Sequence, residues 1–206
     1  MMKYLRNHFT RLFLIISVLI YSTATAATET QPNQIVNAFH EVLLSTMKNA
    51  KKLGVKGRYE KIAPEIEQIF HLPLMAQVSS GSYWRKASDK QIKQLVKAFT
   101  HISISTYASQ FDGFSGQSFL IKGEKVGPQN TILVKTQIIK PETTPINITY
   151  VTQKIKKQWR IIDVLLNNGI SELAIRRSEY RRILKTDGLN GLIATLNKKA
   201  DQLLIE

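Results

Sequence analysis

Apolar and polar residues recur along this chain with two different periods. In the first half the apolar positions repeat at helical spacing. This spacing predicts four helices, over residues 33–53, 58–70, 72–81 and 88–110. We expect Gly54 and Gly57 to end the first helix, and Pro64 to start or kink part of the second. Ser88 and Gln91 have the spacing of a capping box at the start of the fourth.

The pattern changes after residue 116, where β-branched and aromatic residues become frequent. Turn-forming residues divide this region into four predicted antiparallel strands, over residues 117–125, 130–140, 145–156 and 158–167. The third strand alternates apolar with polar residues, so one of its faces is expected to meet water. The fourth is apolar on both faces and is expected to be central or covered on both sides. Helical spacing then resumes over 170–185 and 189–204.

Helices that are segregated from a single antiparallel sheet are typical of the α+β class. We therefore predict an α+β fold in which helices wrap a curved four-stranded antiparallel sheet, as in cone-shaped NTF2-like sheets. Such an arrangement can enclose an apolar cavity. The hydrophobic pattern alone does not distinguish that cavity from a filled core.

Residues 1–26 have the composition of a secretory signal peptide. Basic residues come first, an apolar run over residues 12–21 follows, and Ala24 and Ala26 supply the small residues that precede a cleavage site. A membrane anchor is the alternative, but it needs about 20 apolar residues. We therefore expect cleavage near Ala26, export to the periplasm of a bacterium, and a single domain over residues 27–206.

The charge of the chain restricts its partners. The net charge is +14, of which three units lie in residues 1–26, and no basic run is longer than two residues. A basic surface favours anionic partners, but an exported protein rarely meets nucleic acid. Anionic lipid and acidic protein are the expected partners. The chain has no cysteine, which excludes disulfides and lipidation at a cysteine.

Candidate chemistry is sparse in this sequence. The four histidines are scattered without metal-ligand spacing, and no nucleotide-binding or hydrolase motif occurs, so we expect no metal and no cofactor. Asp163 lies inside an apolar strand and could act as a general base with Tyr150 on the neighbouring strand. A structural anchor is the more common role for such a carboxylate. A small enzyme and an adaptor that binds only proteins remain the alternatives to a carrier.

Six segments resemble, in the correct order, the MlaC-type periplasmic lipid-binding proteins, which are also called toluene-tolerance proteins. The segments that carry this resemblance are residues 57–64, 70–75, 81–85, the helix around 97–107, 159–164 and 171–180. The last of them is most similar to the hopanoid-associated branch of the family.

The resemblance implies a carrier rather than an enzyme. It implies an α+β fold with an apolar cavity that takes a phospholipid, or a hopanoid in that branch, between the outer and inner membranes. This transport would maintain the lipid asymmetry of the outer membrane. The implied partners are an outer-membrane lipoprotein complex and an inner-membrane transporter, which is an ABC system for phospholipid and an RND-type exporter for hopanoid.

We place the acyl chains between the inner face of the sheet and the flanking helices. The candidate lining residues are apolar positions of the predicted helices and strands: Leu74, Met75, Val78, Leu95, Phe99, Ile102, Val134, Ile148, Tyr150, Ile161 and Leu173. Membership of an ordinary core is an equally good interpretation of each one alone. The candidates for the pocket mouth, where a headgroup would bind, are the basic residues Arg85, Lys86, Arg176 and Arg177.

Overall fold

The computed structural model describes residues 31–167 and 169–205, so the predicted signal peptide lies outside the described part of the chain. The helices are α1 (Pro32–Lys48), α2 (Ala50–Ile69), α3 (Leu72–Ser80), the 3-10 helix η1 (Gly81–Lys86), α4 (Asp89–Gln110) and α5 (Glu172–Leu203). The strands are β1 (Ser118–Val126), β2 (Thr131–Ile139), β3 (Ile146–Ile155), β4 (Gln158–Leu166) and β5 (Ile170–Ser171). No helix within the described residues is long and apolar enough to cross a bilayer.

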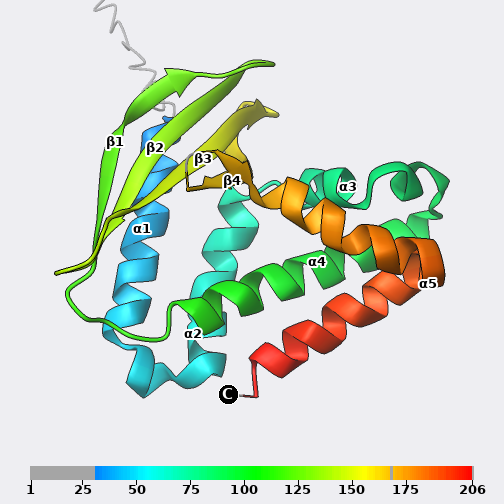
Figure 1. Ribbon diagram of the computed structural model, residues 1–206, viewed down its shortest axis with the longest axis horizontal. Helices are drawn as coiled ribbons and strands as arrows, with labels where there is room; N and C mark the ends of the chain where they lie inside the picture. Colours follow the sequence, from blue (N-terminus) through cyan, green and yellow to red (C-terminus); the bar gives the residue numbers. More distant parts are fainter. Residues whose placement is uncertain (1–30, 168, 206) are drawn as a thin grey trace, which may run out of the picture.

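The five strands form one antiparallel sheet in the order β1-β2-β3-β4-β5. The sheet is curved and does not close on itself, and α1 passes behind β2 and β3 while α4 and α5 extend to one side of it (Figure 1). The predicted α+β class and the four predicted strands are therefore confirmed. The two-residue strand β5 was not predicted.

One face of the sheet is buried against the helices. Ile148, Tyr150 and Thr152 of β3 are buried on this inner face, whereas the residues between them are more exposed. The alternation predicted for the third strand is thus confirmed. Helix α1 contacts β1, β2 and β4, and α5 contacts β4. The hydrophobic core therefore lies between the inner face and the helices.

Strand β4 has hydrogen-bonded partners on both of its edges, as expected for a central strand. It pairs with β3 on one edge, and on the other the backbone N–H of His71 donates to the carbonyl of Ile161 over 2.8 Å. A register shift between β3 and β4 leaves Ile162 as an extra residue. Because of this bulge, Ile161 and Val164 are both buried although they are three residues apart.

The prediction that Gly54 and Gly57 end the first helix is wrong. The chain turns earlier, at Asn49, whose backbone N–H donates to the carbonyls of Thr46 and Met47. Its side-chain amide donates to the carbonyl of Ser45 over 2.8 Å. Asn49 therefore satisfies carbonyls that a helix end leaves free. Gly54, with φ 62°, is a kink inside α2, and Gly57 and Pro64 lie within the same element.

The later helix boundaries follow the sequence more closely. The capping box at the start of α4 is confirmed, since the Ser88 hydroxyl accepts from the Gln91 N–H and the Gln91 side chain accepts from the Ser88 N–H. The two helices predicted after residue 170 are one element, α5. Gly188, with φ 64°, kinks it into two arms, over residues 172–187 and 189–203.

Candidate functional site

Most of the predicted lining residues meet in one place. Nine of the eleven belong to a single hydrophobic cluster between the inner face of the sheet and the helices: Met75, Leu95, Phe99, Ile102, Val134, Ile148, Tyr150, Ile161 and Leu173. Their side chains come from six elements, α3, α4, β2, β3, β4 and α5. In the structure they pack against one another as core, so their role as the lining of a lipid cavity stays a prediction.

Leu74 and Val78 lie outside this cluster. The buried residues of α3 are Leu72, Met75, Ala76, Ser79 and Ser80, which form one stripe at helical spacing. Two of these positions are serines whose hydroxyls donate to the carbonyl of Ala76. Leu74 and Val78 lie on the neighbouring face, and Val78 is 40% exposed.

Three aromatic residues that were not among the predicted lining residues, Phe39, Phe70 and Tyr107, pack around Tyr150 in the interior. Phe39 of α1 packs edge-on against Phe70, Tyr107 and Tyr150, with ring centroids 5.3–6.3 Å apart. These contacts tie α1 to α4, to β3 and to the end of α2. Phe39 stands at an apolar position with helical spacing within residues 33–53, and this spacing is the feature of the sequence that could have placed it in the core.

His40 is a buried polar residue beside this aromatic group. Its ring stacks on Phe119 with centroids 4.5 Å apart, and its Nε2 lies 3.2 Å from the hydroxyl oxygen of Tyr150. Its Nδ1 has no hydrogen-bond partner among the described residues. Burial lowers the pKa of His40 from 6.5 to about 4, and burial raises the pKa of Tyr150. Both side chains are therefore neutral near pH 7.

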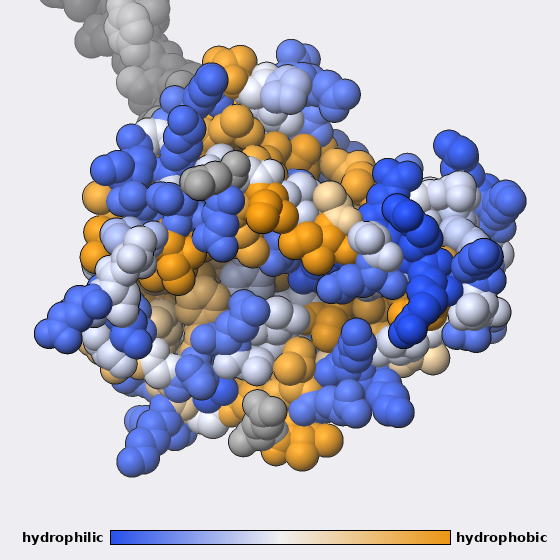
Figure 2. Space-filling view, viewed as in Figure 1, coloured by the Kyte–Doolittle hydropathy of each residue, from blue (hydrophilic) through white to orange (hydrophobic). Residues whose placement is uncertain are grey.

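A surface groove lies between α4 and the two arms of α5. Its volume is about 660 Å³, within the range of roughly 300–1,000 Å³ of small-molecule pockets. Apolar residues show between polar ones on this side of the molecule (Figure 2). The groove is lined by Ile102, Thr106, Glu172, Ile175, Arg176, Ser178, Glu179, Tyr180, Arg182, Ile183, Thr195, Leu196 and Lys199.

Arg176 connects this groove with the hydrophobic core. Its guanidinium lies 5.1 Å from the centroid of the Phe99 ring. It also donates to the hydroxyl of Ser103 over 3.3 Å and pairs with the Glu172 carboxylate at 3.5 Å. Its side chain is only 15% exposed. Arg176 is thus a fixed positive charge at the boundary between an apolar interior and an open groove.

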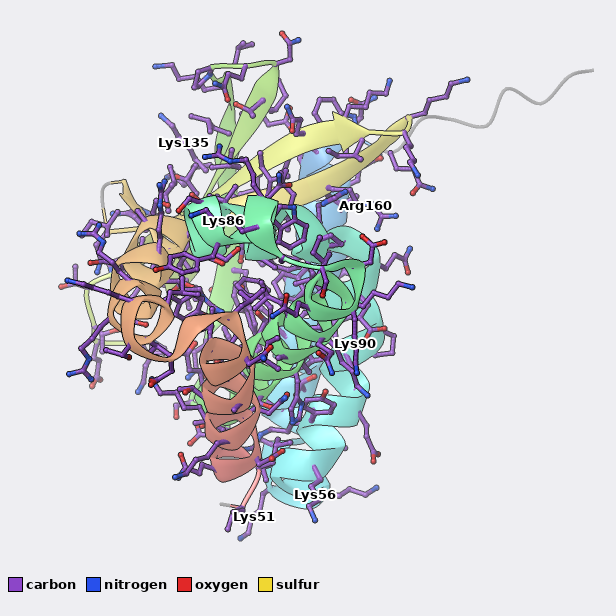
Figure 3. The ribbon with its side chains drawn as sticks, turned by 90° about the vertical axis from the view of Figure 1, so that its right-hand side faces the viewer. Lys51, Lys56, Lys86, Lys90, Lys135 and Arg160 are labelled. Carbon is purple, nitrogen blue, oxygen red and sulfur yellow. The ribbon has the colours of Figure 1, made fainter. Side chains whose placement is uncertain are left out.

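The other three predicted mouth residues lie elsewhere. Arg85, Lys86 and Arg177 are exposed, and none of them lines the groove. The guanidinium of Arg177 lies next to Gly81 at the start of η1, and α5 contacts η1. Lys86 is at the surface in the side-chain view (Figure 3). These three residues lie at a basic surface beside η1, whereas Arg176 lines the groove, and a headgroup role for any of the four stays a prediction.

Asp163 and Tyr150 do not face each other. Tyr150 pairs in register with Val164 and points to the inner face, whereas Asp163 pairs with Val151. The carboxylate of Asp163 accepts from the Ser171 hydroxyl at 2.5 Å and from the Leu173 N–H at 3.2 Å. Asp163 therefore anchors the start of α5, and the candidate catalytic pair is not brought together. The described residues contain no cluster of three His, Cys, Asp or Glu side chains that could hold a metal ion.

Comparison with known proteins places this geometry in context. The sequence model of the MlaC protein family matches residues 37–198. The fold is similar to the crystal structure of a phospholipid-binding protein from Ralstonia solanacearum in complex with a phospholipid, with a TM-score of 0.73 and 18% sequence identity. The match covers 84% of this chain and 99% of the Ralstonia protein.

Proposed function

Because the chain belongs to the MlaC family, we propose that it binds a phospholipid and carries it through the periplasm between the outer and inner membranes. The observation that carries this proposal is the family match together with the shared fold of a protein that holds a phospholipid. A carrier function needs a ligand site and no catalytic group, and the pair that could have supported an enzyme is not assembled.

The described structure offers the two environments that an amphipathic ligand needs. The acyl chains lie between the inner face of the sheet and the flanking helices, where Phe99, Ile102 and Ile148 belong to one apolar cluster. The headgroup lies at the groove, where the guanidinium of Arg176 supplies a fixed donor for a phosphate. Ile102 belongs to both environments, so the apolar cluster and the groove adjoin each other at this residue.

The physical need for such a carrier follows from the cost of exposing lipid to water. Moving roughly 30 methylenes into water at about 0.8 kcal/mol each costs over 20 kcal/mol. A protein interior replaces the bilayer interior at little cost. The direction of transport then comes from the partners, which in our proposal are an outer-membrane lipoprotein complex and an inner-membrane ABC transporter. A hopanoid cargo with an RND-type exporter is the corresponding variant for the hopanoid branch.

Residues 1–26 act as the signal peptide of this carrier in our proposal. This segment directs export and is removed near Ala26. Transport by the mature carrier then maintains the lipid asymmetry of the outer membrane. The net charge of +14 includes three positive charges of this segment, so the mature carrier keeps a basic surface. That surface suits anionic membranes and acidic protein partners.

Native mass spectrometry of the exported protein, purified without detergent, tests the proposal directly. We expect a discrete adduct of phospholipid mass, and extraction with organic solvent followed by mass analysis identifies its class. A hopanoid adduct would identify the hopanoid variant. A protein that is lipid-free and takes up nothing from liposomes would contradict the carrier function.

Variants of one strand test where the acyl chains lie. Ile148 lies on the inner face of the sheet, and its neighbour Thr149 lies on the opposite face. We expect Ile148→Trp to reduce the amount of lipid that co-purifies with the folded protein, and Thr149→Trp, the matched control, to leave it unchanged. Phe99→Trp tests the helical side in the same way. A folded Ile148→Trp protein with a full load of lipid would remove Ile148 from the lining.

A further inference from the structure

A surface of unusual composition lies where α1 meets α2. Four lysines fall within nine residues at this corner, and residues 42–59 contain no acidic residue. All four side chains are exposed. They are Lys48, Lys51, Lys52 and Lys56, and we refer to them as the lysine corner. Lys51 and Lys56 project from one end of the molecule, far from Lys135 and Lys86 (Figure 3).

The charges of the lysine corner are not neutralised by the fold. Among residues 31–167 and 169–205, no carboxylate forms an ion pair with any of the four lysines. The Nζ of Lys48 lies 5.4 Å from the ring centroid of Phe114, in the loop that follows α4. That ring is itself 43% exposed. The corner thus combines four free positive charges with one exposed aromatic ring.

The residue types favour a lipid surface over a protein surface as the partner. Protein interfaces are enriched in arginine and depleted in lysine, and arginine is the residue that fits a carboxylate with a fixed geometry. The only arginine at this corner, Arg58, is buried and donates to the carbonyl of Ala108 over 2.6 Å. Lysines act as point charges, which suits the diffuse negative charge of a bilayer. An exposed phenylalanine ring beside them suits the boundary between the headgroups and the acyl chains of a membrane.

From this arrangement we propose that the lysine corner and Phe114 dock the protein onto the surface of a bilayer that contains anionic phospholipid. The proposal rests on the proposed carrier function, since a carrier must come close to a membrane to exchange its ligand. It adds the face of the molecule that makes this approach.

Docking through this corner also orients the sheet. The backbone N–H of Asn33, near the start of α1, donates to the Glu124 carboxylate near the end of β1, and His40 in the middle of α1 stacks on Phe119 at the start of β1. The end of α1 therefore extends past the start of β1, to the loop that holds Phe114. Ile146, on the same end of the sheet, is 50% exposed and shares its face with Ile148 and Tyr150. Docking through the corner would thus turn the end of the sheet that carries the exposed Ile146 toward the membrane.

Flotation with vesicles tests this docking with the full exported protein. We expect binding to vesicles of phosphatidylethanolamine and phosphatidylglycerol at low salt, weaker binding at high salt, and little binding to phosphatidylcholine vesicles. Each surface lysine contributes roughly fivefold to such partitioning, so Lys51→Gln with Lys52→Gln lowers it about 20- to 30-fold. Phe114→Ser lowers it as well, and this part of the loss persists at high salt.

The matched control removes the same charge elsewhere. Lys90 and Lys93 are exposed on α4, and Lys90 lies away from the corner in Figure 3. We expect Lys90→Gln with Lys93→Gln to change vesicle binding less than about threefold, because salt screens charges that lie away from the docked surface. Equal losses in both double variants would overturn the proposal, because net charge would then explain the binding. Absence of binding by the unchanged protein would also overturn it and would favour an acidic protein partner.

The lipid content of each protein keeps this test separate from the carrier function. We expect native mass spectrometry to find the same lipid adduct in the unchanged protein and in both double variants. A lipid-loaded protein that does not bind anionic vesicles would contradict the proposed docking alone. A lipid-free protein that still binds them contradicts the carrier function alone.

Discussion

The Nε2 of His40 lies 3.2 Å from the hydroxyl oxygen of Tyr150, and this contact joins α1 to the inner face of the sheet. The two residues are 110 positions apart in the sequence. Both are buried among aromatic rings, with Phe39 and Phe119 as neighbours. A titratable group is therefore held inside the region where we place the acyl chains, and its protonation is linked to the stability of the fold.

The pKa of His40 predicts how stability depends on pH. Burial lowers this pKa to about 4 in the folded state, whereas the unfolded imidazole titrates near 6.5. The contribution of His40 to the free energy of unfolding is thus complete above about pH 6.5 and declines as the pH falls. The total loss below pH 4 is about 3 kcal/mol.

Urea unfolding at neutral and acidic pH measures this loss. His40→Gln cannot titrate, and its amide can still bond with Tyr150. We expect the unchanged protein to lose about 2–3 kcal/mol more than His40→Gln between about pH 7.5 and about pH 4.5. Aspartate and glutamate side chains also titrate in this pH range, but they do so in both proteins, so their effect on stability cancels in the comparison. Equal losses in the two proteins would show that His40 is not the group responsible.

Asp163 is expected to matter for stability and not for turnover. Its carboxylate accepts from the Ser171 hydroxyl and the Leu173 N–H at the start of α5. Asp163→Asn replaces the charged acceptor of these hydrogen bonds by a neutral amide, and we expect it to lower the free energy of unfolding by about 1–2 kcal/mol. We expect the lipid content of the protein to stay unchanged. Thermal unfolding and native mass spectrometry measure the two effects. An Asp163→Asn protein with normal stability and no bound lipid would contradict the structural role and would indicate that Asp163 takes part in ligand binding.

Arg176 is expected to hold the phosphate of the ligand. Replacing it by Gln removes the charge, whereas replacing it by Lys keeps it, so we expect Arg176→Gln to retain much less phospholipid through a high-salt wash than Arg176→Lys. The loss of its contacts with Phe99 and Glu172 costs about 1 kcal/mol of stability. Arg177→Gln, an exposed neighbour outside the groove, is the control. Equal lipid retention by the Gln and Lys variants would argue against a headgroup contact.

The kink of α5 depends on a backbone conformation that favours glycine. Gly188 has φ 64° and ψ −163°, a region nearly closed to other residues. Gly188→Ala should therefore cost about 1–3 kcal/mol in the free energy of unfolding, although no atom lies within 4 Å of the added methyl group. Gly113→Ala has similar free space and no positive φ, and we expect it to be nearly neutral. Equal effects of the two substitutions in thermal unfolding would contradict this explanation.

The sequence pattern predicted those features that local chemistry decides. The capping box of Ser88 and Gln91, the four long strands and the two-part last helix all follow from short-range signals. The early end of α1 does not, because Asn49 competes with Gly54 as the terminator and only the packed structure decides between them. The bulge at Ile162 likewise has no sequence signal, since an extra apolar residue fits an apolar strand.

The candidate site was predicted in part for similar reasons. Apolar character located Phe99, Ile148 and Tyr150 in the interior, because burial of apolar side chains is a strong constraint. It could not identify His40, a polar residue whose burial depends on a partner 110 positions away. It also selected Val78 over Ser79 and Ser80, because serines that bond to their own helix can be buried without any apolar signal.

The sequential strand order has a consequence for the way this chain folds. Each of the four long strands pairs with its neighbour in the sequence, so the sheet can grow one hairpin at a time with short loops to close, which favours fast folding. Helix α1 is made first but contacts β1, β2 and β4, and the bond between Asn33 and Glu124 spans 91 residues. We therefore expect α1 to dock late, so that in the last step of folding the first helix to be made closes over a sheet that has already formed.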